Sequence, residues 1–286
     1  MSSNREWAEQ TSPSSDEGTK ASSMPTITTK RILSLALPSL GALIAEPLFT
    51  VIDSTMVGHL GTPQLAGLGI AATVLNTAVG LFIFLAYSTT SLAGRHLGAG
   101  RRDLALRSGV EAMWLAGGFG VVAAVLLALF ASPLLSWLGA DATTLPHALA
   151  YLRASAPGLV GMFVVLAATG TLRGLQDTRT PLVAASAGAA FNAVANWTLM
   201  YPLGLGVAGS GLGTAITQTL MAVFLAWIIV RAARRQGVSL RPSTSGLVGA
   251  AVEGTPLLVR TLALRVALLA TLSAVTAIST QALAAH

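Results

Sequence analysis

The chain has 286 residues, of which 53% are hydrophobic and only 10% are charged, and its formal net charge is +6. A soluble domain carries about 25% charged residues, so this composition excludes an ordinary soluble protein. Cysteine is absent, which excludes disulfides and thiolate metal sites. No charged residue lies between Asp53 and Arg95 or between Arg179 and Arg231. Each interval exceeds the roughly 20 apolar residues that cross a bilayer once, so we predict an all-α polytopic membrane protein.

The chain begins with a polar segment, residues 1–31, which is rich in Ser and Thr and lacks an apolar core. We interpret it as a cytoplasmic tail without a cleavable signal peptide. Gly and Pro turns divide the remainder into about seven predicted transmembrane helices. They lie near 32–57, 66–92, 109–131, 148–172, 181–201, 208–230 and 256–280.

Basic residues predict the orientation, because cytoplasmic loops of membrane proteins are enriched in Lys and Arg. The first, third and fifth predicted loops contain neither. The second, fourth and sixth loops are basic, with Arg95, Arg101, Arg102 and Arg107, then Arg173 and Arg179, then Arg231, Arg234, Arg235 and Arg241. This alternation places the even loops and the amino terminus in the cytoplasm. Trp137 and Trp227 lie near predicted membrane interfaces.

The first and seventh predicted helices show a weak internal similarity at an offset of 218 residues. Pro38 aligns with Pro256, and Thr62 aligns with Thr280. Internal repeats are common in transporters. We therefore expect a six-helix lobe at 32–235, a cytoplasmic linker at 236–255 and the first helix of an incomplete second lobe at 256–286.

Asp53 is the strongest candidate for a functional residue. A charged side chain within a membrane span costs at least ~2.5 kcal/mol, so such residues usually face a cavity and take part in function. An apolar setting favours the neutral form of a carboxylate, which suits proton or cation coupling. The alternative is a structural carboxylate that bonds backbone groups at the end of its helix.

Other features of the first helix indicate a moving part. Glu46 lies seven residues before Asp53 and hence on the same helix face. It precedes Pro47, which removes a backbone donor and can open the helix locally, and Pro38 supplies a second possible bend. For Glu46 a role in the cavity and a structural hydrogen bond are both open, and Pro38 could simply begin the helix.

Amides form two further polar pairs. Asn192 and Asn196 lie one turn apart on the fifth predicted helix, and Thr214 and Gln218 lie one turn apart on the sixth. Polar faces in a bilayer point towards other helices. These four residues either line a substrate or ion path or simply hold the helices together.

Several functions lack the required residues. The four histidines have no spacing typical of metal ligands, so we expect no metal site. The motif GLGVAG at 204–209 matches a dinucleotide fingerprint, but it follows a membrane span, and the next acidic residue is as distant as Glu253. No nucleophile–base pair is apparent, and the arginines are explained by topology. We therefore expect neither an enzyme nor a nucleic-acid-binding protein.

Four stretches resemble the multidrug and toxic compound extrusion (MATE) family, particularly its DinF-like branch. They are LALPSLGALIAEPLFTVIDSTMVGHLGTPQLAGLGIAATV, AGRHLGAGRRDLA, RGLQDTRTPL and GLGVAGSGLGTAI. The resemblance extends from about Lys30 to the last residue. It implies twelve helices in two six-helix lobes, of which this chain would supply the first lobe and the seventh helix.

The same resemblance implies a function. Family members export cationic or amphipathic compounds in exchange for protons or sodium, need no other cofactor, and reside in the plasma (inner) membrane. Their coupling carboxylate corresponds to Asp53, and polar residues of the same cavity correspond to Asn192, Asn196 and Thr214. Some members have an acid at the position of Asn196, so its amide favours protons over sodium. We expect a monomer in the bilayer whose partner is a small molecule.

Two alternatives remain open at this point. A flippase for lipid-linked precursors, from the same superfamily, would usually carry more charge in its central cavity. The second alternative is a fragment that does not transport, because a single lobe lacks the interface across which a substrate is passed.

Overall fold

The computed structural model describes residues 50–244 without a break, together with 40, 44, 47, 247–249, 251–252 and 254–264. All regular elements within this part of the chain are helices, which confirms the all-α prediction. Helical residues at 50–58 precede the first complete element. The complete helices are α2 (Thr62–Phe82), α3 (Phe84–Gly98), α4 (Arg102–Trp137), α5 (Leu145–Ser155), α6 (Gly158–Gly174), α7 (Arg179–Met200) and α8 (Val207–Arg235).

Five helical stretches among the described residues are long and apolar enough to cross a membrane, and a sixth is formed if α5 and α6 are taken together. These stretches correspond to the predicted helices from the second onwards. The last one, Leu247–Leu264, includes described helical residues that precede the predicted start at residue 256. Most of the first predicted helix lies outside the described residues.

Two of the predicted spans are interrupted. α5 and α6 meet at an angle of 54° across Ala156 and Pro157, because a proline cannot donate the backbone hydrogen bond that would continue the helix. α2 and α3 are separated by Ile83 alone. Ile83 keeps helical dihedral angles, with φ −59° and ψ −21°, and Gly80 precedes it by one turn. The rings of Phe82 and Phe163 stack at this break, with centroids 4.4 Å apart.

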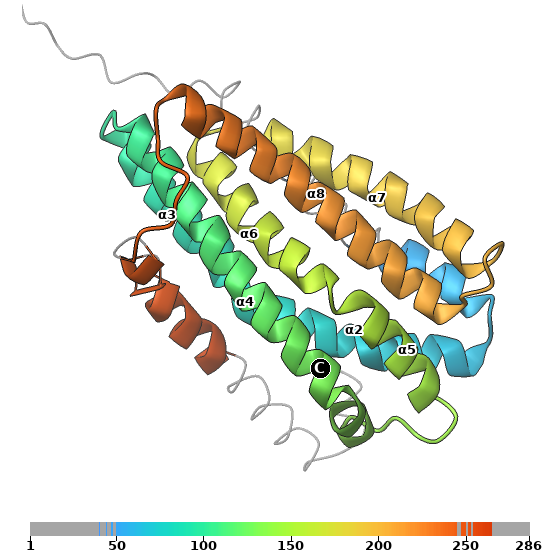
Figure 1. Ribbon diagram of the computed structural model, residues 1–286. Helices are drawn as coiled ribbons and strands as arrows, with labels where there is room; N and C mark the ends of the chain where they lie inside the picture. The colour runs from blue at the N-terminus through green and yellow to red at the C-terminus, as the bar shows by residue number, and fades with distance from the viewer. Residues whose placement is uncertain are drawn as a thin grey trace, which may run out of the picture. The chain divides into compact units, whose positions relative to one another are not determined.

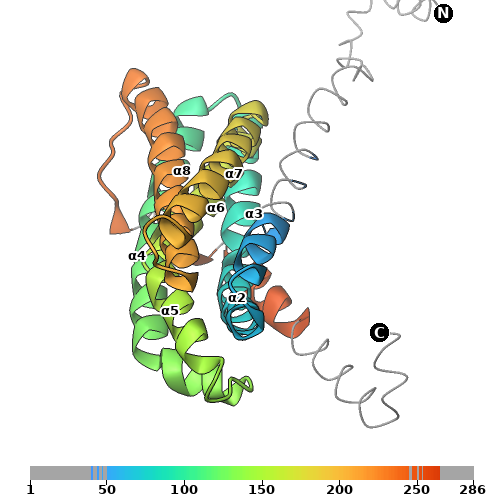
Figure 2. The ribbon, with the colours of Figure 1, turned by 90° about the vertical axis from the view of Figure 1, so that its right-hand side faces the viewer.

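Helix α6 lies at the centre of the packing and contacts α3, α4 and α8. Both views show α7 and α8 side by side (Figure 1, Figure 2). Small residues make these approaches close. An added Cβ at Gly158 would lie 2.7 Å from the Cα of Ala215, and one at Gly161 would lie 2.7 Å from the backbone of Gln218. The glycines of α6 therefore allow α8 to pack directly against its backbone.

The outer faces of the helices are apolar. On α4, Val121, Val125 and Leu129 are 52%, 52% and 70% exposed, and α8 exposes Val223 in the same way. Apolar side chains on the outside of a helical bundle are stable in contact with lipid. This surface supports the prediction of a membrane protein that crosses the bilayer several times.

The segment that follows α8 is attached to α4 by two hydrogen bonds. The indole nitrogen of Trp114 donates to the carbonyl of Leu240 at 3.1 Å. The hydroxyl of Ser243 donates to Oε1 of Glu111 at 2.7 Å, and Arg107 contacts the same oxygen at 3.4 Å. Residues 236–243 are thereby held against α4.

Candidate functional site

Asp53 lies in the helical segment 50–58 and is only 5% exposed. Two side chains from other helices donate hydrogen bonds to its Oδ1. The hydroxyl of Ser210, near the start of α8, is one donor. The amide of Asn196, on α7, is the other, with Nδ2 2.9 Å from the carboxylate oxygen. The carboxylate therefore connects three helical segments that are distant in the sequence.

The two asparagines of α7 are fully buried and bond to each other. Nδ2 of Asn196 lies 3.1 Å from Oδ1 of Asn192, and Nδ2 of Asn192 lies 3.3 Å from Oδ1 of Asn196. Their spacing of one turn places both amides on the face that α7 presents to the first helical segment. Asn192 thus orients the amide that reaches Asp53.

Tyr151 and Thr214 complete the polar cluster. Tyr151, on α5, is 5% exposed, and its side chain interacts with both Asp53 and Thr214. Thr214 lies one turn after Ser210 on α8 and is 3% exposed. Its Oγ1 has no hydrogen-bond partner of regular geometry among the described residues. Beside its contact with Tyr151, this buried hydroxyl keeps the capacity for a further hydrogen bond to a ligand.

The partners of Asp53 are all neutral. Ser210, Asn196 and Tyr151 are uncharged donors, and within the described part of the chain no Lys, Arg or His comes within ion-pair distance of the carboxylate. An ionised carboxylate buried without a counter-charge is expensive. The group is therefore suited to take up a proton or to bind a cation.

Glycines on α8 create the space that this cluster needs. A Cβ added at Gly213 would collide with Oδ1 of Asn196, and one at Gly209 would lie 2.7 Å from the backbone of Leu199. On the opposite face, a Cβ at Gly211 would lie 2.6 Å from the carbonyl oxygen of Tyr151. The motif GSGLGT therefore lets α7 and α5 approach α8 closely enough for their polar side chains to meet the carboxylate.

A further bond holds the end of the first helical segment. The hydroxyl of Tyr201, directly after α7, donates to the carbonyl oxygen of Met56 at 2.7 Å. This bond lies three residues beyond Asp53, where the segment approaches the turn that leads to α2. It involves no charged group.

The structure brings together Asp53, Asn192, Asn196 and Thr214 from the predicted set of site residues. Gln218 is half-buried one turn beyond Thr214, and no hydrogen bond joins its side chain to the cluster. Pro47 is helical and exposed. Glu46 and Pro38 lie outside the described residues.

Two residues of the cluster, Ser210 and Tyr151, were missed by the sequence analysis. Ser210 precedes Thr214 by four residues, so the same one-turn spacing that identified Thr214 and Gln218 could have found it. Tyr151 had no such signal, because a single tyrosine near the start of a predicted span is equally typical of a membrane interface.

The described residues contain no group of three or more His, Asp or Glu side chains that could hold a metal ion. The single carboxylate of the cluster is surrounded by neutral amide and hydroxyl groups.

A sequence profile of the MatE family matches residues 38–198, which is more than half of the chain. The chain belongs to the MatE family. The matched region includes Asp53, Tyr151 and both asparagines of α7.

Three curated relatives align with about 70% of this chain. Protein DETOXIFICATION 44, chloroplastic, of Arabidopsis thaliana is 34% identical over 68% of this chain and 40% of its own length. DNA damage-inducible protein F of Escherichia coli is 29% identical over 73% of this chain and 46% of its own length. Probable multidrug resistance protein NorM of Rhizobium meliloti is 30% identical over 75% and 47%. The chain thus spans about half the length of these MatE relatives.

Solved structures share the fold. A crystal structure of MATE in the bent conformation matches with a TM-score of 0.78 and 24% sequence identity, over 88% of this chain and 58% of that chain. This similarity agrees with the helical architecture described above. The chain is therefore a multi-pass membrane protein with the MatE fold.

Proposed function

We propose that this chain forms the amino-terminal lobe, residues 32–235, of an efflux antiporter that exchanges cationic or amphipathic small molecules for protons. Membership of the MatE family supports transport as the function. The name of the Rhizobium meliloti relative, a probable multidrug resistance protein, supports drugs as substrates. The protein would act in the plasma (inner) membrane with its amino terminus in the cytoplasm.

The observation that carries this proposal is the neutral environment of a single buried carboxylate. Asp53 is 5% exposed and receives hydrogen bonds from Ser210 and Asn196, without a cationic side chain within ion-pair distance in the described part of the chain. Such a group can be balanced only by a proton or by a mobile cation. A proton and a cationic substrate would therefore compete for it, which is the requirement for exchange.

The remaining polar residues have supporting roles in this proposal. Asn192 and Asn196 orient the carboxylate, while Thr214 and Gln218 offer hydrogen-bonding groups along the face of α8 to a bound substrate. Glu46 would add a second acidic group to the cavity, and Pro38 and Pro47 would let the first helix bend. A membrane potential supplies about 2.3 kcal/mol per charge per 100 mV, which is sufficient to bias such a cycle.

The proposal predicts that Asp53→Asn abolishes exchange, because an amide can neither release a proton nor balance a cation. The protein is expressed from its gene in a bacterial strain without its own drug efflux pumps. In inverted membrane vesicles, addition of a cationic dye should dissipate a preformed proton gradient for the wild type and not for Asp53→Asn. Asp141→Asn is the control, since Asp141 is a fully exposed loop carboxylate.

Binding can be tested separately on the 286-residue chain in detergent. A hydrophobic carbodiimide should label Asp53, and a cationic dye should protect it from labelling.

In the vesicle assay, proton-gradient dissipation by Asp53→Asn equal to that of the wild type would refute the coupling role. Dissipation that requires sodium would replace the proton with sodium as the coupling ion.

A further inference from the structure

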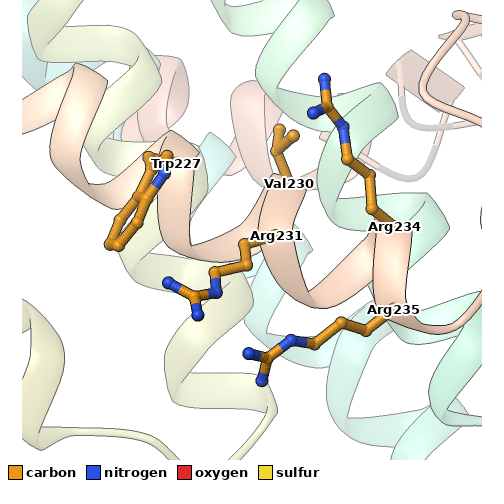
Figure 3. Close-up of a pocket in the computed structure, with 5 residues that line it drawn as sticks. All are labelled: Trp227, Val230, Arg231, Arg234 and Arg235. Carbon is orange, nitrogen blue, oxygen red and sulfur yellow. The ribbon is translucent and has the colours of Figure 1, made fainter.

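The carboxyl-terminal end of α8 forms a pocket that the exchange cycle does not use. Its volume is about 320 Å³, and it is lined by Trp227, Val230, Arg231, Arg234 and Arg235 (Figure 3). The guanidinium group of Arg231 lies over the ring of Trp227, 5.3 Å from its centroid. The pocket therefore combines an aromatic wall with three cationic groups.

Within the described part of the chain, these cationic groups have no carboxylate partner. Arg231, Arg234 and Arg235 are all exposed, and no carboxylate of the described residues lies within ion-pair distance of them. Figure 3 shows Arg231 and Arg235 extending to the same side of the helix end, whereas Arg234 extends away from them. Arg231 and Arg235 are thus the pair that faces a common ligand beside Trp227.

The pocket lies at the level of a membrane interface. α8 has 29 residues, which corresponds to about 43 Å of helix, so it extends beyond a hydrocarbon core of about 30 Å. Leu220, Val223 and Trp227 are 50%, 62% and 54% exposed on the turns that precede the arginines. An exposed apolar face that ends in a tryptophan and then in arginines is typical of the transition from acyl chains to head groups.

We infer that this pocket binds the phosphate head group of an anionic phospholipid. Arg231 and Arg235 would donate to the phosphate oxygens, which the planar guanidinium group contacts in a bidentate manner. Trp227 would pack at the level of the glycerol backbone, and the acyl chains would follow Val223 and Leu220. Free inorganic phosphate shares the head-group chemistry, but it gains nothing from this apolar face.

The test measures lipid binding to the 286-residue chain in detergent by native mass spectrometry. Phosphatidylglycerol and phosphatidylcholine are titrated separately, and inorganic phosphate is added as a competitor. The altered variant is Arg231→Gln with Arg235→Gln. The matched control is Arg101→Gln with Arg102→Gln, which removes the same charge from two exposed arginines of another basic loop.

The wild type should bind phosphatidylglycerol in preference to phosphatidylcholine. The Arg231/Arg235 variant should bind it about 30-fold more weakly, because each arginine near an anionic head group contributes about fivefold and the two factors multiply. The control pair should retain wild-type affinity, and Arg234→Gln should cause a smaller loss than either Arg231→Gln or Arg235→Gln.

Three results would overturn the inference. Equal losses in the two double variants would show a response to net charge alone. Equal binding of the two lipids would exclude recognition of the anionic head group. Displacement of phosphatidylglycerol by millimolar inorganic phosphate would assign the pocket to free anions. All substituted side chains are exposed, and identical elution and circular dichroism of the variants would confirm that they fold.

Discussion

Substitution of Gly213 by alanine gives a direct test of how the helices assemble the Asp53 site. The added methyl group would collide with Oδ1 of Asn196 and lie 3.1 Å from its Cγ. The asparagine side chain must then move, because the alternative is displacement of the α8 backbone. Movement of the side chain breaks the 2.9 Å bond from Asn196 to Asp53 and disturbs its pairing with Asn192.

The magnitude follows from two contributions. A hydrogen bond to a charged group contributes about 1.5–3 kcal/mol, although bonds between membrane helices average nearer 0.6 kcal/mol. Overpacking of a close helix contact costs about 1–3 kcal/mol. We therefore expect Gly213→Ala to lower the free energy of unfolding by about 2–4 kcal/mol. The measurement is unfolding of the detergent-solubilised chain in sodium dodecyl sulfate, followed by circular dichroism.

Gly69→Ala provides the control, since an added Cβ there would meet nothing within 4 Å. It should be neutral or stabilise α2 by up to about 1 kcal/mol. A double-mutant cycle then isolates the steric cause. Asn196→Ala removes the group with which the new methyl collides, so Gly213→Ala should cost less in that background by about 1 kcal/mol or more. Additive losses would refute the collision as the explanation.

Two further predictions concern regions outside the site. Trp114→Phe removes the hydrogen bond to the carbonyl of Leu240. Proteinase K should then cleave the chain within residues 236–243 about 2- to 10-fold faster. The control is Trp137→Phe, at a site 82% exposed, which should leave the cleavage rate unchanged. Hydrogen bonds from Thr143 and Thr144 lower the pKa of Asp141 from its ordinary 3.8 to about 2. The ionised Asp141 therefore stabilises the α4–α5 loop fully above pH 3.8, and this stabilisation is lost as the pH falls through about 2. Hydrogen exchange of the Thr144 amide should become faster over this pH range in the wild type. The Asp141→Asn variant should show no such change.

The helical spans were predictable because the bilayer imposes a simple constraint on sequence. Long uncharged stretches such as Thr180–Val230 have few alternatives to membrane helices. The break at Ile83 was not predictable. It contains no proline, its nearest glycine is Gly80 one turn earlier, and the packing of Phe82 against Phe163, about 80 residues away, accompanies it. Contacts of this kind carry no local signal.

The site was predictable only in part, for a related reason. Asp53 and the two asparagines are conspicuous because polar side chains are expensive within apolar spans. Ser210 and Tyr151 cost little in a membrane helix, and only the close approach of α5 and α8 at Gly211 gives Tyr151 its place in the cluster. The participation of Tyr151 therefore requires the tertiary structure before it can be recognised, whereas Ser210 is marked only by its one-turn spacing from Thr214.

The helical segment 50–58 is attached at Asp53 and at Met56, and the two attachments respond differently when Asp53 takes up a proton. Bonds from Ser210 and Asn196 end on the carboxylate of Asp53, and hydrogen bonds to a charged acceptor are roughly twice as strong as neutral ones. The bond from Tyr201 to the Met56 carbonyl carries no charge and should persist. In the proposed cycle, neutralisation of Asp53 therefore weakens the attachment at that residue while residue 56 stays bound. Movement is then confined to the part of the helix before Asp53, where Pro47 has already removed one backbone hydrogen bond.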